Sequence, residues 1–339
     1  MATVLITGGA GFIGSYVARE LIQKGEQVVL YDAFIQYVSP LENNYCIHLR
    51  ERFKGILDKV IIVRGDTRNK NELRRTILKY QPERIIHLAA LPLADLADTH
   101  SEEALESILH GTVNILDILR DVGFVKRFVY TSSSMIYGDF MFHPADEEHP
   151  KNPKDIYGGT KLAGEILVQS YGRRYEIEYT IIRPSAVYGP TDVNRRVSQI
   201  FVENALRGEK LVLHNGGKSK LDFTYVKDVA QGFVLATYRP EAKNEIFNIT
   251  RGEGRSLREY AEILQSLLPG VEIVEQPANV FRPERGALDI SKARKLLGYE
   301  PQYSLEEGLK EYVAYFKKLK NRKPESRNSR LFRILNSES

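Results

Sequence analysis

Short apolar runs alternate with longer amphipathic stretches along the first half of the chain. The runs are rich in β-branched residues, as strands are, and lie at Thr3–Thr7, Val28–Tyr31, Val60–Arg64, Arg84–Leu88 and Arg127–Thr131. The longer stretches carry apolar residues at helical spacing and lie at Ile13–Lys24, Lys70–Tyr80, Ala104–Val122 and Tyr157–Tyr175. Strands that alternate with helices build βαβ units, so the pattern predicts an α/β fold around a doubly wound parallel sheet.

The pattern changes near Arg183, where prolines and glycines begin to separate shorter elements. We therefore expect a first domain over residues 1–182 and a smaller C-terminal lobe over residues 183–316. A helix predicted at Asp228–Thr237 suggests that residues 222–250 return to the first domain. Residues 317–339 are polar and basic and lack apolar periodicity, which predicts a mobile tail.

Composition narrows the class of protein. The chain has 339 residues, of which 42% are apolar and 27% charged, as in globular proteins with a sizeable core. Its 48 basic residues nearly balance 44 acidic ones, which argues against nucleic-acid binding. A single cysteine, Cys46, and the lack of a signal segment before the first strand favour the cytoplasm. No apolar run approaches the ~20 residues that a membrane-spanning helix needs, so we expect no membrane span.

A glycine-rich loop follows the first predicted strand. Gly8, Gly11 and Gly14 lie at intervals of three residues, between a strand and a helix. Gly8 permits a tight turn, Gly11 lets backbone amides approach a pyrophosphate, and Gly14 allows the helix to pack closely on the strand. The helix N-terminus also favours anionic charge. The alternative is a simple flexible turn, but the context predicts a dinucleotide-binding loop in a Rossmann domain.

Carboxylates follow the next two strands. Asp32 ends the strand Val28–Tyr31, where it could hydrogen-bond the ribose hydroxyls of an adenosine and would repel a 2′-phosphate. This predicts NAD rather than NADP, against the alternative that Asp32 is a solvated strand-end residue. Asp66 follows Val60–Arg64 and could contact the adenine amino group.

Three polar residues suggest redox chemistry. Ser133 follows the strand Arg127–Thr131, and Tyr157 lies one helical turn before Lys161, so that their side chains point the same way. A free tyrosine has a pKa of about 10, so the lysine ammonium and an oxidised nicotinamide would have to lower it for acid–base work near neutral pH. Ser133 would hydrogen-bond the reacting hydroxyl. The alternative for Tyr157 and Lys161 is an ordinary pair on a helix surface.

These motifs resemble the extended short-chain dehydrogenases/reductases, in their group of NAD-dependent sugar-nucleotide epimerases and dehydratases. The resemblance covers almost the whole chain and also rests on His87-Leu88-Ala89-Ala90, Ser132–Gly138, Arg183–Pro190, Leu221–Asp228, Asp289–Ala293 and Leu297-Gly298-Tyr299. It implies that Tyr157 is the acid/base, that Lys161 is its ribose-bound partner and that Ser133 orients the substrate. It also implies a homodimer formed through helices Ala104–Val122 and Tyr157–Tyr175.

We expect NAD to be the cofactor and a nucleotide sugar to bind beside it, with the C-terminal lobe as the substrate-binding lobe. The expected NAD contacts are Gly8, Gly11, Phe12, Ile13, Gly14, Asp32, Asp66, Thr67, Leu88, Ala89, Ala90, Thr131, Tyr157, Lys161, Pro184 and Ser185. The expected substrate contacts are Leu91, Ser133, Ser134, Met135, Arg195, Arg196 and Arg285.

The residues after Ser133 bear on the reaction. Dehydratases of this family usually carry an Asp-Glu pair where this chain has Ser134 and Met135, and related decarboxylases tend to keep the glutamate. Without a carboxylate to take the C5 proton, dehydration is disfavoured. We therefore expect a UDP-glucose or UDP-glucuronate 4-epimerase. The alternatives are an NAD(P)-dependent reductase or dehydrogenase with net turnover, and a non-catalytic NAD-binding regulator.

The substrate side departs from the family pattern at three positions. Ile108, Ala186 and Leu221 stand where an Asn, an Asn and an Arg are usual. A diphosphate needs charge-assisted donors, and we expect Arg285 first among the candidates. The candidates, each of which could instead be a solvated surface charge, are Arg195, Arg196, Lys218, Lys220, Arg282 and Arg285. The sugar and the base stay open.

Other polar residues are expected to have structural or solvated positions. His87 lies at a strand end and is expected to be packed rather than catalytic. Arg183 is expected to orient the loop on the nicotinamide side. Asp146, Glu147 and His149 lie in a proline-rich loop that we expect to be solvated, so no metal site is predicted.

Overall fold

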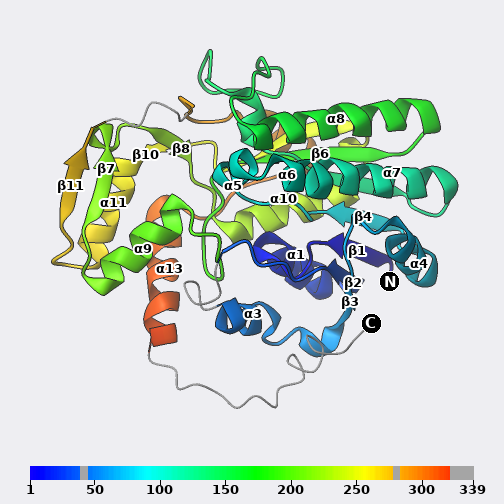
Figure 1. Cartoon of the computed structure of the whole chain (residues 1–339), viewed down its shortest axis with the longest axis horizontal. Coiled ribbons are helices and arrows are strands. Elements are labelled where there is room, and N and C mark those ends of the chain that lie inside the picture. The colour runs from blue at the N-terminus through cyan, green and yellow to red at the C-terminus, as the bar shows by residue number, and fades with distance from the viewer. Residues whose placement is uncertain (39–44, 278–282, 321–339) are drawn as a thin grey trace.

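Seven parallel strands form the central sheet of the computed structural model, in the order β3-β2-β1-β4-β5-β6-β9 (Figure 1). The structure describes residues 1–38, 45–277 and 283–320. The strands are β1 Thr3–Thr7, β2 Gln27–Asp32, β3 Val60–Arg64, β4 Arg84–His87, β5 Arg127–Thr131, β6 Tyr179–Pro184 and β9 Glu245–Ile249. The predicted Rossmann-type doubly wound sheet is confirmed.

Helices cover both faces of this sheet, which is why its strands are apolar on both sides. Val4 and Ile6 of β1 face one cluster, while Leu5 faces the other, as the alternation of side chains along a strand requires. The first face packs against α1 Phe12–Gln23, α3 Tyr45–Phe53, α10 Val226–Tyr238 and α12 Ser291–Leu297. The second packs against α4 Lys70–Tyr80, α7 Gly111–Asp121 and α8 Ile156–Tyr175.

A smaller lobe has its own apolar core, which includes Tyr188, Phe223, Tyr260 and Tyr312. It lies to the left in Figure 1 and joins three helices to two small sheets, β8 with β10 and β7 with β11. Its elements are α9 Val197–Arg207, β7 Leu211–His214, β8 Lys220–Asp222, β10 Gly254–Ser256, α11 Leu257–Leu267, β11 Ile273–Gln276 and α13 Leu305–Lys320.

The chain crosses between the two parts more than once. After β8 it returns to the large sheet, where α10 packs against α1 and β9 pairs with β6. The last helix, α13, continues to Lys320, so the first four residues of the predicted tail, 317–320, are helical. The rest of that tail lies outside the described residues.

Three short helical segments follow β4 in the chain. They are α5 Ala94–Thr99, α6 Ser101–Ala104 and the π-helix η2 Leu105–His110, which runs directly into α7. The predicted helix Ala104–Val122 therefore contains a π-helical stretch. None of the helices that the structure describes is long and apolar enough to cross a membrane.

Candidate active site

A cavity of about 1240 Å³ opens at the carboxyl ends of β1, β2, β4 and β5, where the sheet meets the smaller lobe. In doubly wound sheets this edge, beside the point where the strand order reverses, is where ligands bind. The volume exceeds the ~300–1,000 Å³ of an ordinary small-molecule site. The cavity therefore has room for a dinucleotide and a second ligand.

The glycine-rich loop forms one wall of this cavity. Gly8 has a φ of +68°, and a Cβ there would lie 2.7 Å from the amide nitrogen of Ala89. A Cβ on Gly14 would lie 2.5 Å from the carbonyl oxygen of Gly8. Helix α1 starts at Phe12 with no side-chain cap and no acidic residue in its first turn. Its free amides can therefore receive an anionic group.

Asp32 lies at the end of β2 and faces the same cavity. Its carboxylate accepts hydrogen bonds from the amides of Ala10 at 2.9 Å and Phe34 at 2.7 Å. Burial raises the pKa of Asp32, while these amides and the nearby Arg52 oppose the rise. These two amides fix the Asp32 carboxylate at the carboxyl end of β2.

Asp66 follows β3, and its carboxylate already forms an ion pair. Arg68 donates to its carboxylate through Nη2 at 2.6 Å and Nε at 2.9 Å. Arg68 also donates to Glu103 at 2.9 Å. An adenine contact by Asp66 would therefore have to accommodate the Arg68 ion pair.

Ser133 and Tyr157 lie on adjoining elements. Ser133 caps a 3₁₀ turn after β5, and its Oγ accepts the amide of Met135 at 3.2 Å. Asp155 caps α8 by accepting the amide of Gly158 at 2.7 Å, which places Tyr157 in the first turn of that helix. Both side chains line the cavity, and the Ser133 hydroxyl acts to lower the pKa of Tyr157.

Lys161 lies one turn further along α8, and its ammonium group is buried. Its Nζ donates to the carbonyl oxygen of Thr131 at 2.7 Å and lies 5.8 Å from the centre of the Tyr157 ring. Burial lowers the pKa of Lys161 to about 7, and Glu165 acts in the opposite direction. The predicted one-turn spacing is present, and the ammonium group binds the carboxyl end of β5.

The surroundings of Tyr157 have opposing effects on the pKa of its phenol. Burial raises the pKa of its phenol, whereas the charge of Arg196 and the hydrogen bond from Ser133 lower it. Among these favourable contributions that of Arg196 is the larger. Its guanidinium donates to the Pro92 carbonyl at 3.1 Å and lies 3.3 Å from Asp192.

Buried polar atoms of the cavity that have no hydrogen-bond partner show whether the cavity fits a dinucleotide. The hydroxyls of Thr131 and Ser132 line the cavity, are buried and have no hydrogen-bond partner in the part of the chain that the structure describes. Buried hydroxyls are rarely left unsatisfied. Together with the glycine cradle and Asp32, they fit the polar edge of a dinucleotide.

Most residues predicted for the two ligands meet at this cavity. Those that line it are Gly8, Gly11, Phe12, Ile13, Gly14, Asp32, Asp66, Thr67, Leu88, Ala89, Ala90, Thr131, Ser133, Ser134, Met135, Tyr157, Lys161, Pro184, Arg195, Arg196 and Arg285. Leu91 and Ser185 do not line the cavity. Leu91 is instead fully buried in an apolar cluster with Ala97, Ala104 and Ile108.

The predicted substrate charges lie at different parts of the cavity. Arg285 lies beside the residues that follow Ser133, and its Nη1 is 3.1 Å from Met135 Sδ. Lys218 and Lys220 line the wall formed by the smaller lobe. Arg282 lies outside the described residues.

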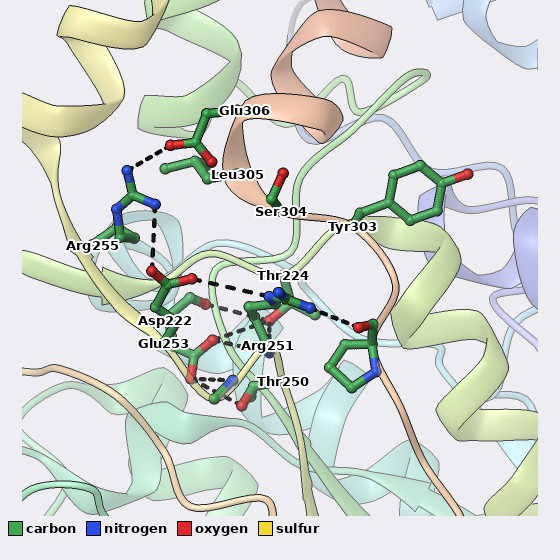
Figure 2. A network of polar contacts seen from close by, with 12 residues as sticks. Asp222, Thr224, Thr250, Arg251, Glu253, Arg255, Tyr303, Ser304, Leu305 and Glu306 are labelled. Atoms are coloured by element: carbon green, nitrogen blue, oxygen red, sulfur yellow. Dashed lines mark hydrogen bonds and ion pairs between the residues drawn. The ribbon is translucent and has the colours of Figure 1, made fainter.

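Asp222 stabilises the cavity wall that the smaller lobe contributes (Figure 2). Its two neighbours in the chain, Leu221 and Phe223, line the cavity. Its buried carboxylate accepts hydrogen bonds from Thr250 Oγ1 at 3.0 Å and from the amides of Arg251, Gly252 and Leu288 at 3.0–3.1 Å. Asp222 thereby ties β8 to two distant segments of the chain.

Several polar side chains outside the cavity have structural positions. His87 is buried between Thr7 and Thr112, at 2.6 and 3.1 Å, and burial lowers its pKa to about 3. Arg183 forms a buried ion pair with Glu165 at 2.7 Å. Its third nitrogen, Nη1, donates to Tyr137 Oη and to the carbonyl of Glu147.

The expectation that the proline-rich loop is solvated is wrong for two residues. Glu147 is 6% exposed and accepts the amide of Asn248, and His149 is fully buried and accepts the amide of Met141. The apolar core below the loop takes up these side chains. Among the described residues, no group of three or more His, Cys, Asp or Glu side chains is placed to hold a metal ion.

Sequence reasoning missed Arg52, which lines the cavity beside Asp32. It lies on α3, a short helix that the apolar pattern did not indicate. Its guanidinium is 3% exposed and donates to Ala10 in the glycine loop. An arginine in a polar stretch gives no signal of this kind until the fold buries it.

Comparison with known proteins identifies the family. The NAD dependent epimerase/dehydratase family matches residues 4–250. A putative UDP-glucose 4-epimerase of Methanocaldococcus jannaschii is 33% identical over 322 residues, which cover 93% of this chain and 98% of that protein. The chain belongs to the NAD dependent epimerase/dehydratase family, and NAD is its cofactor, as the sequence predicted.

Solved structures agree with this assignment. A UDP-glucose 4-epimerase of Thermotoga maritima, solved with UDP-glucose, has a TM-score of 0.84 and 29% identity, covering 94% of this chain and 100% of its own. A UDP-glucuronic acid 4-epimerase of Bacillus cereus has a TM-score of 0.85 and 26% identity, covering 94% and 99%. Relatives also include a dTDP-D-glucose 4,6-dehydratase and a UDP-glucuronic acid decarboxylase, so the family includes more than one reaction.

Proposed function

We propose that this protein is a 4-epimerase of a nucleotide-diphosphate sugar, either a UDP-hexose or a UDP-hexuronate. The proposal rests on the identity of the two side chains that follow Ser133. Ser134 and Met135 provide no carboxylate, and Met135 faces Arg285. A dehydratase needs a base for the C5 proton and an acid for the departing hydroxyl, whereas an epimerase needs only one acid/base at the oxidised carbon.

The proposed steps use residues that the cavity brings together. NAD, when bound, would supply reversible hydride transfer at the sugar carbon. Tyr157 would take the proton of the sugar hydroxyl and later give it back, while Ser133 would orient that hydroxyl. Lys161, whose Nζ donates to the Thr131 carbonyl, would hold the nicotinamide ribose.

The remaining contacts are proposed from their places in the cavity. Glycines 8, 11 and 14 and the start of α1 would hold the pyrophosphate, and Asp32 the adenosine ribose. Arg195, Arg196 and Arg285 would supply positive charge to the nucleotide sugar, in place of the usual residues at Ile108, Ala186 and Leu221.

The proposal is tested with purified protein and no added cofactor. UDP-glucose, UDP-glucuronate, UDP-N-acetylglucosamine and GDP- and CDP-hexoses are incubated with it, and the products are separated by chromatography and identified by NMR. We expect a 4-epimer without net change in NADH absorbance, because an epimerase regenerates its NAD in every turnover. Tyr157→Phe should lower the rate by about 10²–10⁴-fold, the usual contribution of a positioned acid/base.

Tyr175→Phe is the matched control, since Tyr175 is exposed at the far end of the same helix, and its rate should not change. Turnover that starts only when NAD or NADPH is added, with a stoichiometric change in absorbance, would instead identify a dehydrogenase or reductase. A 4-keto-6-deoxy product would identify a dehydratase and disprove the epimerase proposal.

A further inference from the structure

The segment that carries Arg196 into the cavity has a strained backbone. Gly189, Thr191 and Arg195 have φ values of +142°, +74° and +51°. For a β-branched residue such as Thr191, the left-handed region is unfavourable and persists only when surrounding contacts enforce it. The contacts that hold this segment therefore bear on the site.

Two side chains that pack around the large sheet, Arg52 of α3 and Tyr16 of α1, hydrogen-bond backbone carbonyls of this segment. Arg52 Nη2 donates to the Thr191 carbonyl at 2.6 Å, and Tyr16 donates to the Pro190 carbonyl at 3.1 Å. Arg52 uses its other terminal nitrogen, Nη1, to donate to the Ala10 carbonyl in the glycine loop at 3.0 Å. The amide of Ala10 in turn binds Asp32. One buried guanidinium thus joins the NAD-binding loop to the strained segment.

Arg52 is itself fixed by its surroundings. Arg19 of α1 donates to the carbonyls of Glu51 and Arg52 at 3.0 and 2.8 Å, which secures the end of α3. His48, one turn earlier on α3, hydrogen-bonds Tyr315 of α13 at 2.7 Å. Helix α3 is therefore held between α1 and the last helix of the smaller lobe.

The chain of contacts continues from Thr191 to Tyr157. The next residue, Asp192, is fully buried, and its carboxylate lies 3.3 Å from Nη1 of Arg196. Arg196 Nη2 binds the carbonyl of Pro92. Leu93, beside Pro92, and the Tyr157 ring pack against the same apolar cluster. This arrangement brings the Arg196 charge close enough to lower the pKa of Tyr157.

We propose that Arg52 is a positioning residue, which fixes the strained segment 189–196 against the NAD-binding loop and thereby holds the Arg196 guanidinium beside Tyr157. The proposal rests on the acid/base role of Tyr157 in the proposed function. It explains why an arginine remote from the chemistry is buried with both of its terminal nitrogens on backbone carbonyls of two different loops. The NAD-binding loop and the acid/base are then coupled through one side chain.

The test follows the ionisation of Tyr157 directly. NAD-saturated protein labelled with [¹³Cζ]tyrosine is titrated by NMR, and the Tyr157 signal is identified by its loss in Tyr157→Phe. Arg196→Gln should raise the titration midpoint by about one pH unit, since an opposite charge is removed from the phenolate. Arg52→Met should raise it in the same direction. The double variant should move no further than Arg196→Gln alone, because both changes act through the same charge.

Lys54→Met and Arg207→Gln are the matched controls. Each removes a positive charge from the surface, one just beyond α3 and one at the end of α9, and neither should move the Tyr157 midpoint. The proposal is overturned if Arg52→Met leaves the midpoint at the wild-type value, or if its shift adds in full to that of Arg196→Gln. It is also overturned if Tyr157 keeps its phenol form throughout the stable pH range of the wild-type protein.

If Arg52→Met does not fold, Arg52→Lys replaces it. A lysine keeps the charge but cannot reach both carbonyls with a forked group, so its midpoint should lie between those of the wild type and Arg196→Gln. A wild-type midpoint in this variant would overturn the proposal. The titration needs no sugar substrate, so the absence of epimerase turnover would reject the proposed function without deciding the role of Arg52.

Discussion

At the scale of single residues, the buried Lys161 makes the stability of the fold depend on pH. Burial lowers its pKa to about 7 from an ordinary value of 10.5. Between these two values the unfolded chain binds a proton that the folded chain does not, so this group makes stability rise with pH across that window. Below pH 7 both states are protonated, and the full cost of the buried charge is present.

We therefore expect the free energy of unfolding of NAD-free protein to rise between pH 7 and pH 10 relative to that of Lys161→Met. The slope should be at most about 1.4 kcal/mol per pH unit, the value for one proton. Denaturant titrations of the two proteins at a series of pH values measure it. Parallel pH profiles would show that Lys161 keeps its ordinary pKa in the fold.

The identity of the candidate acid/base residues could be read from the sequence, but their electrostatics could not. Tyr157 and Lys161 are close along the chain, and one helical turn is enough to place them together. The charge that lowers the pKa of Tyr157 belongs to Arg196, which reaches it from another loop across the cavity. That approach depends on the strained backbone of segment 189–196, for which the residue types give no signal.

At the scale of elements, the single carboxylate of Asp222 connects β8 in the cavity wall to two other segments of the chain. It accepts hydrogen bonds from the loop after β9 (Figure 2). It also accepts one from the amide of Leu288. Asp222→Ala would leave these buried donors unsatisfied, at about 1–3 kcal/mol for each such group. We expect the variant to lose about 3–5 kcal/mol of stability, and thermal and denaturant unfolding measure this loss.

Glu253→Ala is the matched control from the same network. Glu253 is 47% exposed, and its carboxylate lies 3.4 Å from Nη1 of Arg255. Exposed pairs of this kind contribute about 0–1 kcal/mol, so this variant should unfold close to the wild type. Equal losses for the two variants would contradict the special position of Asp222.

The elements of the large sheet were predictable because local pattern and tertiary environment agree. A strand such as β3, or a helix such as α4, has the predicted bounds because its apolar residues face a core at the expected period. The helix α3 was missed because it is short, and because its buried face combines apolar residues with the polar His48 and Arg52. Hydrogen bonds to Tyr315 for His48, and to the carbonyls of Ala10 and Thr191 for Arg52, make the burial of these two side chains favourable.

At the scale of the whole molecule, the two parts are bound together by a chain that passes back and forth. Helix α10 and strand β9 lie after the start of the smaller lobe in sequence, yet they complete the layer around the large sheet. The helical pattern of Asp228–Thr237 predicts a return to the first domain over residues 222–250. It could not predict that the cavity wall is shared, because that depends on how the irregular loops fold over it.

The outer surface of the molecule also bears on the proposed homodimer, which helices α7 and α8 would form. Ile166 on α8 is 55% exposed, and Leu105 at the start of the adjoining helical segment is 48% exposed. Pairing two copies would remove these apolar side chains from water, and a two-fold interface would use each of them twice. We expect a dimer in light scattering coupled to gel filtration at micromolar concentration, and a shift toward monomer for Ile166→Glu. Leu78→Glu, an equally exposed apolar position on α4, should leave the dimer intact, whereas a monomeric wild type would rule the assembly out.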